Sequence, residues 1–163
     1  KLPYAMLMSN ADQSSGGTTS ENLVTYNQPI LEHGIRRDPS NPSRIYFDYP
    51  GEYLVNVGCQ VTNRANAVHE FELWAKNTGV NYPLSNTRFD VPVRKSASIW
   101  GHIVTSISGI FTVNDPTTEY LEMAWWSDST DVYIESYAAN TSPTRPAIPS
   151  VILTANYLSA ESV

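Results

Sequence analysis

Apolar and polar residues alternate with a period of two along much of this chain, which is the pattern of strands that bury one face. The alternation is clearest in residues 52–62, where the odd-numbered positions from Tyr53 to Val61 are apolar and most even-numbered positions are polar. No window repeats apolar residues at helical spacing for three turns, so the pattern predicts an all-β fold. Further strands are expected at residues 44–47, 68–76, 98–113, 120–126, 132–138 and 151–158.

A turn signature joins two of these expected strands. Pro50-Gly51 lies directly between residues 44–47 and residues 52–62. Proline fixes its own φ and glycine accepts a positive φ, so the pair is typical of a tight turn. We therefore expect the two strands to form a hairpin.

Three segments have the composition of linkers. Residues 14–20 are rich in Gly, Ser and Thr, and prolines punctuate residues 38–43 and 140–149. None of them resembles a domain boundary, so we expect one domain over residues 1–163. Its expected parts are an N-terminal strand with a mobile loop (residues 1–21), a main sandwich (residues 22–158) and a tail (residues 159–163).

The charge of the chain excludes some partners. Charged residues make up 16% of the sequence, against roughly 25% in typical soluble proteins, so much of the surface must be neutral and polar. The formal net charge is −6, and the ten Lys and Arg residues are scattered. Phosphate binding needs clustered cations, so nucleic acid is not an expected partner. No apolar run approaches the roughly 20 residues of a membrane helix, so membrane insertion is not expected either.

The residue types that usually carry catalysis or bind cofactors form no known signature. The single cysteine, Cys59, falls in an alternating strand, where a small buried apolar role is expected. His33, His69 and His102 have no second His or Cys at metal-ligand spacing, and the serine-hydrolase elbow and phosphate-binding glycine loops are absent from the sequence. We expect neither an enzyme nor a cofactor.

Carboxylates leave one enzymatic alternative open, because a glycosidase needs only a pair of them. Glu70 and Glu72 lie two apart on one expected strand and face the same way. Glu119 and Glu122 are the other candidates. Acidic residues on an outward strand face usually serve solubility, so catalysis is the disfavoured interpretation.

Aspartates leave a second alternative, a calcium site. Asp128 and Asp131 bound a polar turn, and Asp115 is nearby in the sequence. Their oxygens are ligands that calcium prefers. Aspartate is also common in turns for local hydrogen-bonding reasons, and the EF-hand pattern is absent from the sequence.

Aromatic residues on the outward faces are the most informative feature. Trp74, Trp100 and Trp126 occupy positions opposite the core-facing residues of their expected strands. Large aromatics are costly in water but suit a buried interface, so these three are predicted to lie between subunits. The alternative is that loops or the second sheet cover them. Tyr82 and Tyr137 are candidates for stacking on a ligand such as a sugar.

The order of motifs resembles the complement-type and tumour-necrosis-factor-like jelly rolls. That family has an aromatic strand end before Pro-Gly-x-Tyr, and IYFDYPGEYLV at residues 45–55 is similar. Its strand that ends in a basic residue and Asn-Gly is similar to ELWAKNTG at residues 72–79, with Thr78 inserted. Its later Gly-Asp is replaced here by Asp115-Pro116. The resemblance covers roughly residues 22–158 and ends on an apolar strand.

The segment PAIPSVILT at residues 146–154 resembles, more particularly, part of the small virion proteins of marine tailed bacteriophages. These modules serve there as capsid decorations, knobs or fibre tips. The resemblance implies an antiparallel two-sheet jelly-roll β-sandwich that forms a homotrimer, with aromatic-rich strands packed about the axis. It brings no catalytic residues.

The expected function is therefore that of a non-enzymatic structural protein. We expect it on the virion surface, on the capsid or the tail, in contact with other virion proteins. The alternative is a module that binds a host-surface glycan or receptor, such as a fibre tip.

Overall fold

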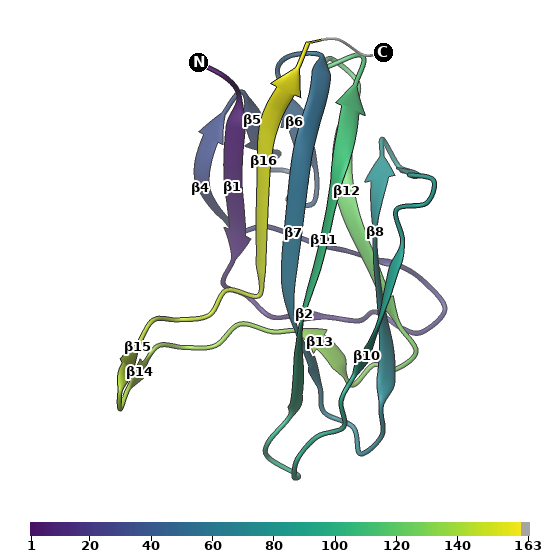
Figure 1. Ribbon diagram of the computed structural model, residues 1–163. Coiled ribbons are helices and arrows are strands. Elements are labelled where there is room, and N and C mark those ends of the chain that lie inside the picture. The colour runs from purple at the N-terminus through teal and green to yellow at the C-terminus, as the bar shows by residue number, and fades with distance from the viewer. Residues whose placement is uncertain (161–163) are drawn as a thin grey trace.

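The computed structural model describes residues 1–160, which form two antiparallel β-sheets packed face to face (Figure 1). These residues contain no α-helix, so the prediction of an all-β sandwich is confirmed. No helix in this part of the chain is long and apolar enough to cross a bilayer. The tail expected at residues 159–163 lies mostly outside the described residues.

The first sheet is built around its longest strands. β7 pairs along one edge with β11 and along the other with β16 and β13, and the sheet continues from β16 through β1 to β4. β2 pairs with β13. The strands are β1 (Tyr4–Ser9), β2 (Gln13–Ser14), β4 (Gln28–His33), β7 (Gly51–Asn63), β11 (Gly101–Val113), β13 (Val132–Ile134) and β16 (Val151–Ser159).

The second sheet has the order β10-β8-β12-β6-β5, with β3 paired to β12 and β9 paired to β8. Its strands are β3 (Asn22–Leu23), β5 (Ile35–Arg37), β6 (Ile45–Phe47), β8 (His69–Asn77), β9 (Val80–Asn81), β10 (Thr87–Val91) and β12 (Tyr120–Ser127). A separate two-stranded sheet pairs β14 (Asn140–Thr141) with β15 (Thr144–Arg145).

The core lies between the two sheets, where the predicted alternation places it. The odd-numbered residues of β7 are buried, and Phe71 and Leu73 of β8 face them from the second sheet. Trp125 of β12 is fully buried and its ring stacks on Phe71 at 5.4 Å between centroids. Each fully buried large apolar side chain contributes about 1.5–3 kcal/mol to folding. The expected buried role of Cys59 is confirmed, since that side chain is 1% exposed.

The expected hairpin across Pro50-Gly51 is wrong. β6 pairs with β5 and β12 in the second sheet, whereas β7 pairs with β11 and β16 in the first. The connection therefore crosses from one sheet to the other. Phe47 and Tyr53 flank it and meet inside the sandwich, with ring centroids 4.5 Å apart.

Two expected strands are shorter than their patterns indicate. The strand predicted at residues 98–113 begins at Gly101, because residues 95–99 form a turn in which the Lys95 N–H donates to the Ile99 carbonyl at 2.8 Å. The strand predicted at residues 132–138 ends at Ile134. The Glu135 N–H still donates to the Gln60 carbonyl at 2.8 Å, but the chain then leaves the sheet.

The linker expected at residues 140–149 contains the β14–β15 hairpin. Residues 138–148 are all exposed, and Figure 1 shows this hairpin projecting from the sandwich. At its base, the backbones of Tyr137 and Ile148 exchange two hydrogen bonds of 3.0 and 2.9 Å. We call residues 138–148 the arm.

Candidate functional site

The outer face of the first sheet points away from the second sheet (Figure 1). The even-numbered residues of β1, β7, β11 and β16 point outward, because their odd-numbered neighbours fill the core. The strand register aligns these outward residues in rows across the four strands. The rows are Met8–Ile152–Gly58–Ser106, Met6–Thr154–Asn56–Ser108 and Tyr4–Asn156–Leu54–Ile110.

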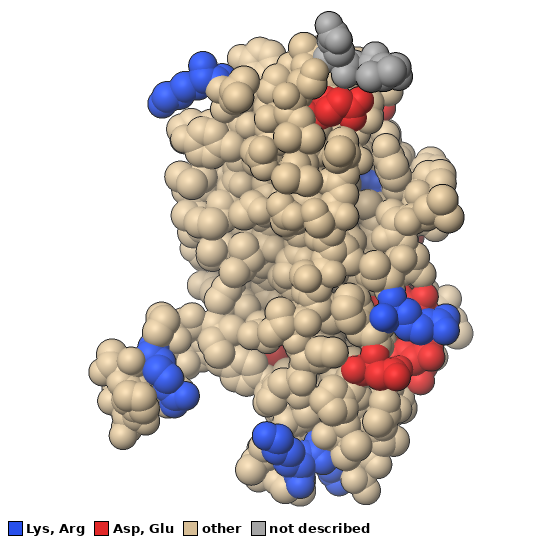
Figure 2. Space-filling model, in the orientation of Figure 1, with Lys and Arg blue, Asp and Glu red and all other residues tan. Residues whose placement is uncertain are grey.

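This surface carries no Lys, Arg, Asp or Glu in those three rows, and we call it the uncharged face. Figure 2 shows the middle of this side of the molecule free of charged residues, with the charges gathered around its margins. Glu52 marks one margin, where its carboxylate accepts a hydrogen bond of 2.7 Å from the Thr112 hydroxyl. The face is also partly apolar, since Ile110 and Ile152 are 54% and 38% exposed.

A shallow hollow of about 420 Å³ lies in the centre of the uncharged face. Gly58 contributes no side chain there, so the surface dips between its larger neighbours. The hollow is lined by Asn56, Val57, Gly58, Ser106, Ile107, Ser108, Ile152 and Thr154. Nearly all of its polar groups are neutral hydroxyls and amides, which lose less on desolvation than charged groups do.

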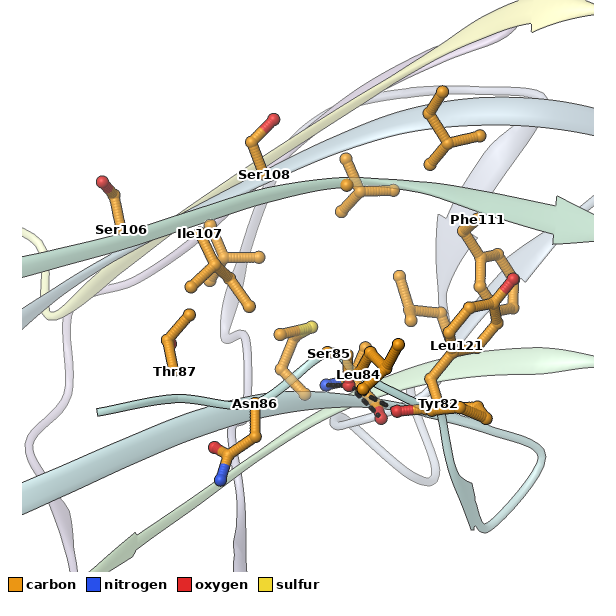
Figure 3. Close-up of a pocket in the computed structure, with 17 residues that line it drawn as sticks. Tyr82, Leu84, Ser85, Asn86, Thr87, Ser106, Ile107, Ser108, Phe111 and Leu121 are labelled. Atoms are coloured by element: carbon orange, nitrogen blue, oxygen red, sulfur yellow. Dashed lines mark hydrogen bonds between the residues drawn. The ribbon is translucent and has the colours of Figure 1, made fainter.

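A second cavity, of about 480 Å³, lies between the sheets beside β11 (Figure 3). Its walls are mainly apolar, and the loop of residues 82–86 closes one side. In Figure 3, Ile107 points into the cavity while Ser106 and Ser108 point away from it. The same segment of β11 therefore borders both this cavity and the uncharged face.

Two of the three predicted interface tryptophans lie together. Trp74 on β8 and Trp126 on β12 point outward from the second sheet, and they are diagonal neighbours because Trp74 pairs with Ala124 and Trp126 with Glu72. Both are partly exposed. Residues 18–21 and β9 cover part of them, in line with the alternative that loops cover them. Their predicted position between subunits stays a prediction.

Trp100 lies elsewhere. It precedes β11 and sits near the Arg64 guanidinium, whose carbon is 5.5 Å from the centroid of the indole ring. Arg64 also lies over the Tyr133 ring at 3.8 Å, so Trp100 belongs to an aromatic and cationic cluster on the first sheet. The structure does not bring the three predicted tryptophans into one patch.

The two predicted ligand-binding tyrosines are also apart. Tyr82 lines the cavity between the sheets, with its ring 6.0 Å from that of Phe111. Tyr137 lies at the base of the arm, where its hydroxyl donates to the Glu135 carboxylate at 3.1 Å. Burial and the adjacent Glu135 carboxylate raise the pKa of Tyr137 above its usual value. Tyr137 thus helps to anchor the arm, and ligand binding by either residue stays a prediction.

The carboxylates considered for catalysis have structural partners. Glu70 and Glu72 do face the same way, but the Arg88 guanidinium lies 4.0 Å from each. Glu119 accepts hydrogen bonds from the backbone N–H groups of residues 114 and 115. Glu122 is buried and accepts a hydrogen bond of 2.5 Å from the Ser43 hydroxyl. Glu119 and Glu122 therefore act within the fold rather than in a cleft.

Asp115 lies far from Asp128 and Asp131, the other two aspartates considered for calcium. Asp115 precedes β12 and Asp128 follows it, so the eight-residue strand separates them by about 26 Å. Asp128 instead accepts a hydrogen bond from the Glu70 N–H at 2.8 Å, and its carboxylate lies 3.2 Å from His69 Nδ1. The Thr117 hydroxyl donates a hydrogen bond to the Asp115 carboxylate within the same turn, and this bond lowers the pKa of Asp115. Within residues 1–160, no three His, Cys, Asp or Glu side chains form a group that could hold a metal ion.

Sequence reasoning missed the two features that stand out in the structure, the uncharged face and the arm. A signal for the face exists, because the even-numbered positions of residues 54–60, 104–110 and 152–158 hold no charged residue. Only the strand register reveals that these positions form one surface. The prolines of the arm predict a linker, and no local pattern indicates the hairpin.

Comparison with known proteins identifies the fold. No family model matches the sequence, and no curated protein matches it. A crystal structure of murine APRIL at pH 5.0 has a similar fold, with a TM-score of 0.56 and 12% sequence identity. The similarity covers 97% of this chain and 100% of that one. The chain therefore has a jelly roll of the tumour-necrosis-factor type.

Proposed function

We propose that this chain is a non-enzymatic structural module that assembles as a homotrimer through the uncharged face. The observation that carries the proposal is the set of three rows of outward-facing, partly or fully exposed residues without one Lys, Arg, Asp or Glu. The depletion of charged residues on this face of a protein with net charge −6 is typical of the core of a protein interface. The similarity of the fold to the tumour-necrosis-factor-type jelly roll supports a trimer.

The physical gain from covering this face is apolar burial without the desolvation of charges. Val104 and Ile110 of β11 are 65% and 54% exposed, and burial of one such side chain contributes about 1.5–3 kcal/mol. The neutral Ser, Thr and Asn side chains between them can exchange hydrogen bonds with water for hydrogen bonds across the interface. A neighbouring subunit would also cover the free edge of β11, which pairs only with β7 among the described strands.

The arm fits the same proposal. Residues 138–148 are exposed throughout, and the hairpin projects beyond the body of its own subunit (Figure 1). Its prolines limit the conformations that it can adopt, so it would lose little entropy on contact with a neighbour. We propose that the arm contacts an adjacent subunit of the trimer.

We further propose that the trimer belongs to a virion surface, on the capsid or the tail, and contacts other virion proteins there. The support is the likeness of residues 146–154 to small phage virion proteins. The test is mass spectrometry of purified particles of the virus that encodes the chain. Stoichiometric presence in the particles is expected, and a chain found only in infected cells would contradict this part of the proposal.

Native mass spectrometry of the purified chain tests the assembly. The expected result is one species at three times 18.1 kDa that persists at low micromolar concentration. A species at 18.1 kDa at every concentration would contradict a homotrimer.

A further inference from the structure

A second surface, on the opposite side of the sandwich, has a different chemistry. Trp74 and Trp126 form a ridge there, and hollows of about 700 and 280 Å³ flank it. Both indoles and Asn81 line both hollows. We call this region the tryptophan groove, and its lining is Thr18, Thr19, Ser20, Glu21, Glu72, Trp74, Lys76, Gly79, Val80, Asn81, Tyr82, Leu84, Ser85, Asn86 and Trp126.

The two indoles are held in place before any ligand arrives. The Trp74 Nε1–H donates to Asn81 Oδ1 at 2.9 Å, and the Trp126 Nε1–H donates to the Thr18 carbonyl at 2.8 Å. Because each polar N–H is already satisfied, the remaining exposed part of each ring is apolar and fixed in orientation. A ligand that stacks on these rings would not have to order them, so the usual entropic cost of binding is reduced.

The groove differs from a structural use of tryptophan in the same protein. Trp125, the neighbour of Trp126 in β12, is fully buried and stacks on Phe71. Trp74 and Trp126 are instead partly exposed and line both hollows. Packing therefore accounts for Trp125 but leaves the exposed parts of the other two indoles without a role.

The charges around the groove are balanced. Lys76 forms an ion pair with Glu21, and the Glu72 carboxylate accepts a hydrogen bond of 2.7 Å from the Asn86 amide with Arg88 nearby at 4.0 Å. Because these charges are paired, they favour neither an anionic nor a cationic ligand. Carboxylates and amides do, however, suit neighbouring hydroxyl groups, which both donate and accept.

We propose that the tryptophan groove binds a neutral oligosaccharide. The apolar C–H face of a pyranose ring packs on a flat indole, and its ring hydroxyls bond to planar carboxylates and amides at the edge. The ridge of two indoles between two hollows offers one stacking surface per sugar unit, which indicates a ligand of at least two units. This inference goes beyond the proposed assembly, because the groove and the uncharged face are on opposite sheets.

The test is isothermal titration of the whole chain with four probes: cellohexaose, maltohexaose, laminarihexaose and chitohexaose. At least one probe is expected to bind, and Trp74→Ala and Trp126→Ala are each expected to weaken its binding at least tenfold. Trp100→Ala is the matched control, since Trp100 precedes β11 beside Arg64 and lines neither hollow, and should change affinity less than twofold. Failure of all four probes to bind, or equal effects of the three variants, would overturn the proposal.

A second readout does not depend on the alanine variants. In a ¹H–¹⁵N spectrum of the unmodified protein, the bound probe should shift the indole resonances of Trp74 and Trp126 and leave those of Trp100 and Trp125 in place. Shifts confined to Trp100 or Trp125 would also overturn the proposal. Light scattering on each variant should show the oligomeric state of the unmodified chain, which separates this test from that of the assembly.

Discussion

Gly51, the first residue of β7, lies so close to Ser159, the last residue of β16, that a Cβ atom on Gly51 would be 2.4 Å from the Ser159 carbonyl oxygen. Its φ of 145° is one that residues with side chains rarely adopt. The chain enters the first sheet at this point, coming from β6 in the second. Only glycine satisfies both the close approach and the dihedral angle.

Replacement of Gly51 by alanine should therefore destabilise the fold. Strain of this kind costs about 1–3 kcal/mol in the free energy of unfolding, and the close contact adds to it. Urea denaturation at constant protein concentration measures the change. Gly109→Ala on β11 is the control, because a Cβ there would meet no atom within 4 Å. Equal stability of the two variants would contradict this account of Gly51.

Alkaline pH should weaken the fold through buried groups that include Cys59 and Tyr53. Burial raises the pKa of Cys59 to about 12, and burial together with Tyr157 raises that of Tyr53 to about 12. Both groups hold their protons more tightly in the folded state. Their contribution to the free energy of unfolding is therefore complete below the unfolded pKa values of about 8.5 and 10. It is lost as the pH rises towards 12.

The measurement is Tm as a function of pH. Tm should fall between pH 9 and pH 12, and the fall should be smaller in Cys59→Ala, which lacks the thiol. A Tm that stays constant over this range, or an identical fall in the variant, would show that Cys59 does not titrate as described.

The arm should be dispensable for folding and needed for assembly. Replacement of residues 138–147 by Asn-Gly would join Tyr137 to Ile148 through a two-residue turn. Because the removed residues are exposed, the free energy of unfolding of the separated subunit should change by less than about 0.5 kcal/mol. The dissociation constant of the trimer should rise at least tenfold. Sedimentation equilibrium measures it, and an unchanged constant would remove the arm from the interface.

The local alternation predicted the core well because each strand buries one face. In residues 52–62 the apolar register agrees with the buried odd-numbered residues of β7, Cys59 included. In β12 Trp125 is buried and Trp126 faces outward, but Glu122 and Ala124 are buried as well, so alternation alone does not describe that strand. The same reasoning failed where the partner of a strand matters. Pro50-Gly51 favours any sharp change of direction, and nothing local distinguishes a hairpin from the crossing between sheets that the structure has.

The candidate sites were harder to predict than the core. The outward direction of Trp74 and Trp126 follows from alternation, but their proximity depends on the pairing of β8 with β12. The alternation predicts an outward Trp100 within a strand, whereas β11 begins one residue later, at Gly101. The uncharged face combines residues from four strands, and no sequence motif marks a surface that lacks charged residues. Each of these features requires the register between strands, which a single sequence does not specify.

The central claim, a trimer through the uncharged face, is tested most directly by one pair of variants under light scattering. Ser108→Arg places a charge in the middle row of the face, and Ser98→Arg makes the same change in an exposed loop outside it. The proposal predicts a mass of three times 18.1 kDa for the unmodified chain and for Ser98→Arg, and 18.1 kDa for Ser108→Arg. An unmodified chain that is monomeric, or a Ser108→Arg variant that remains trimeric, would contradict it.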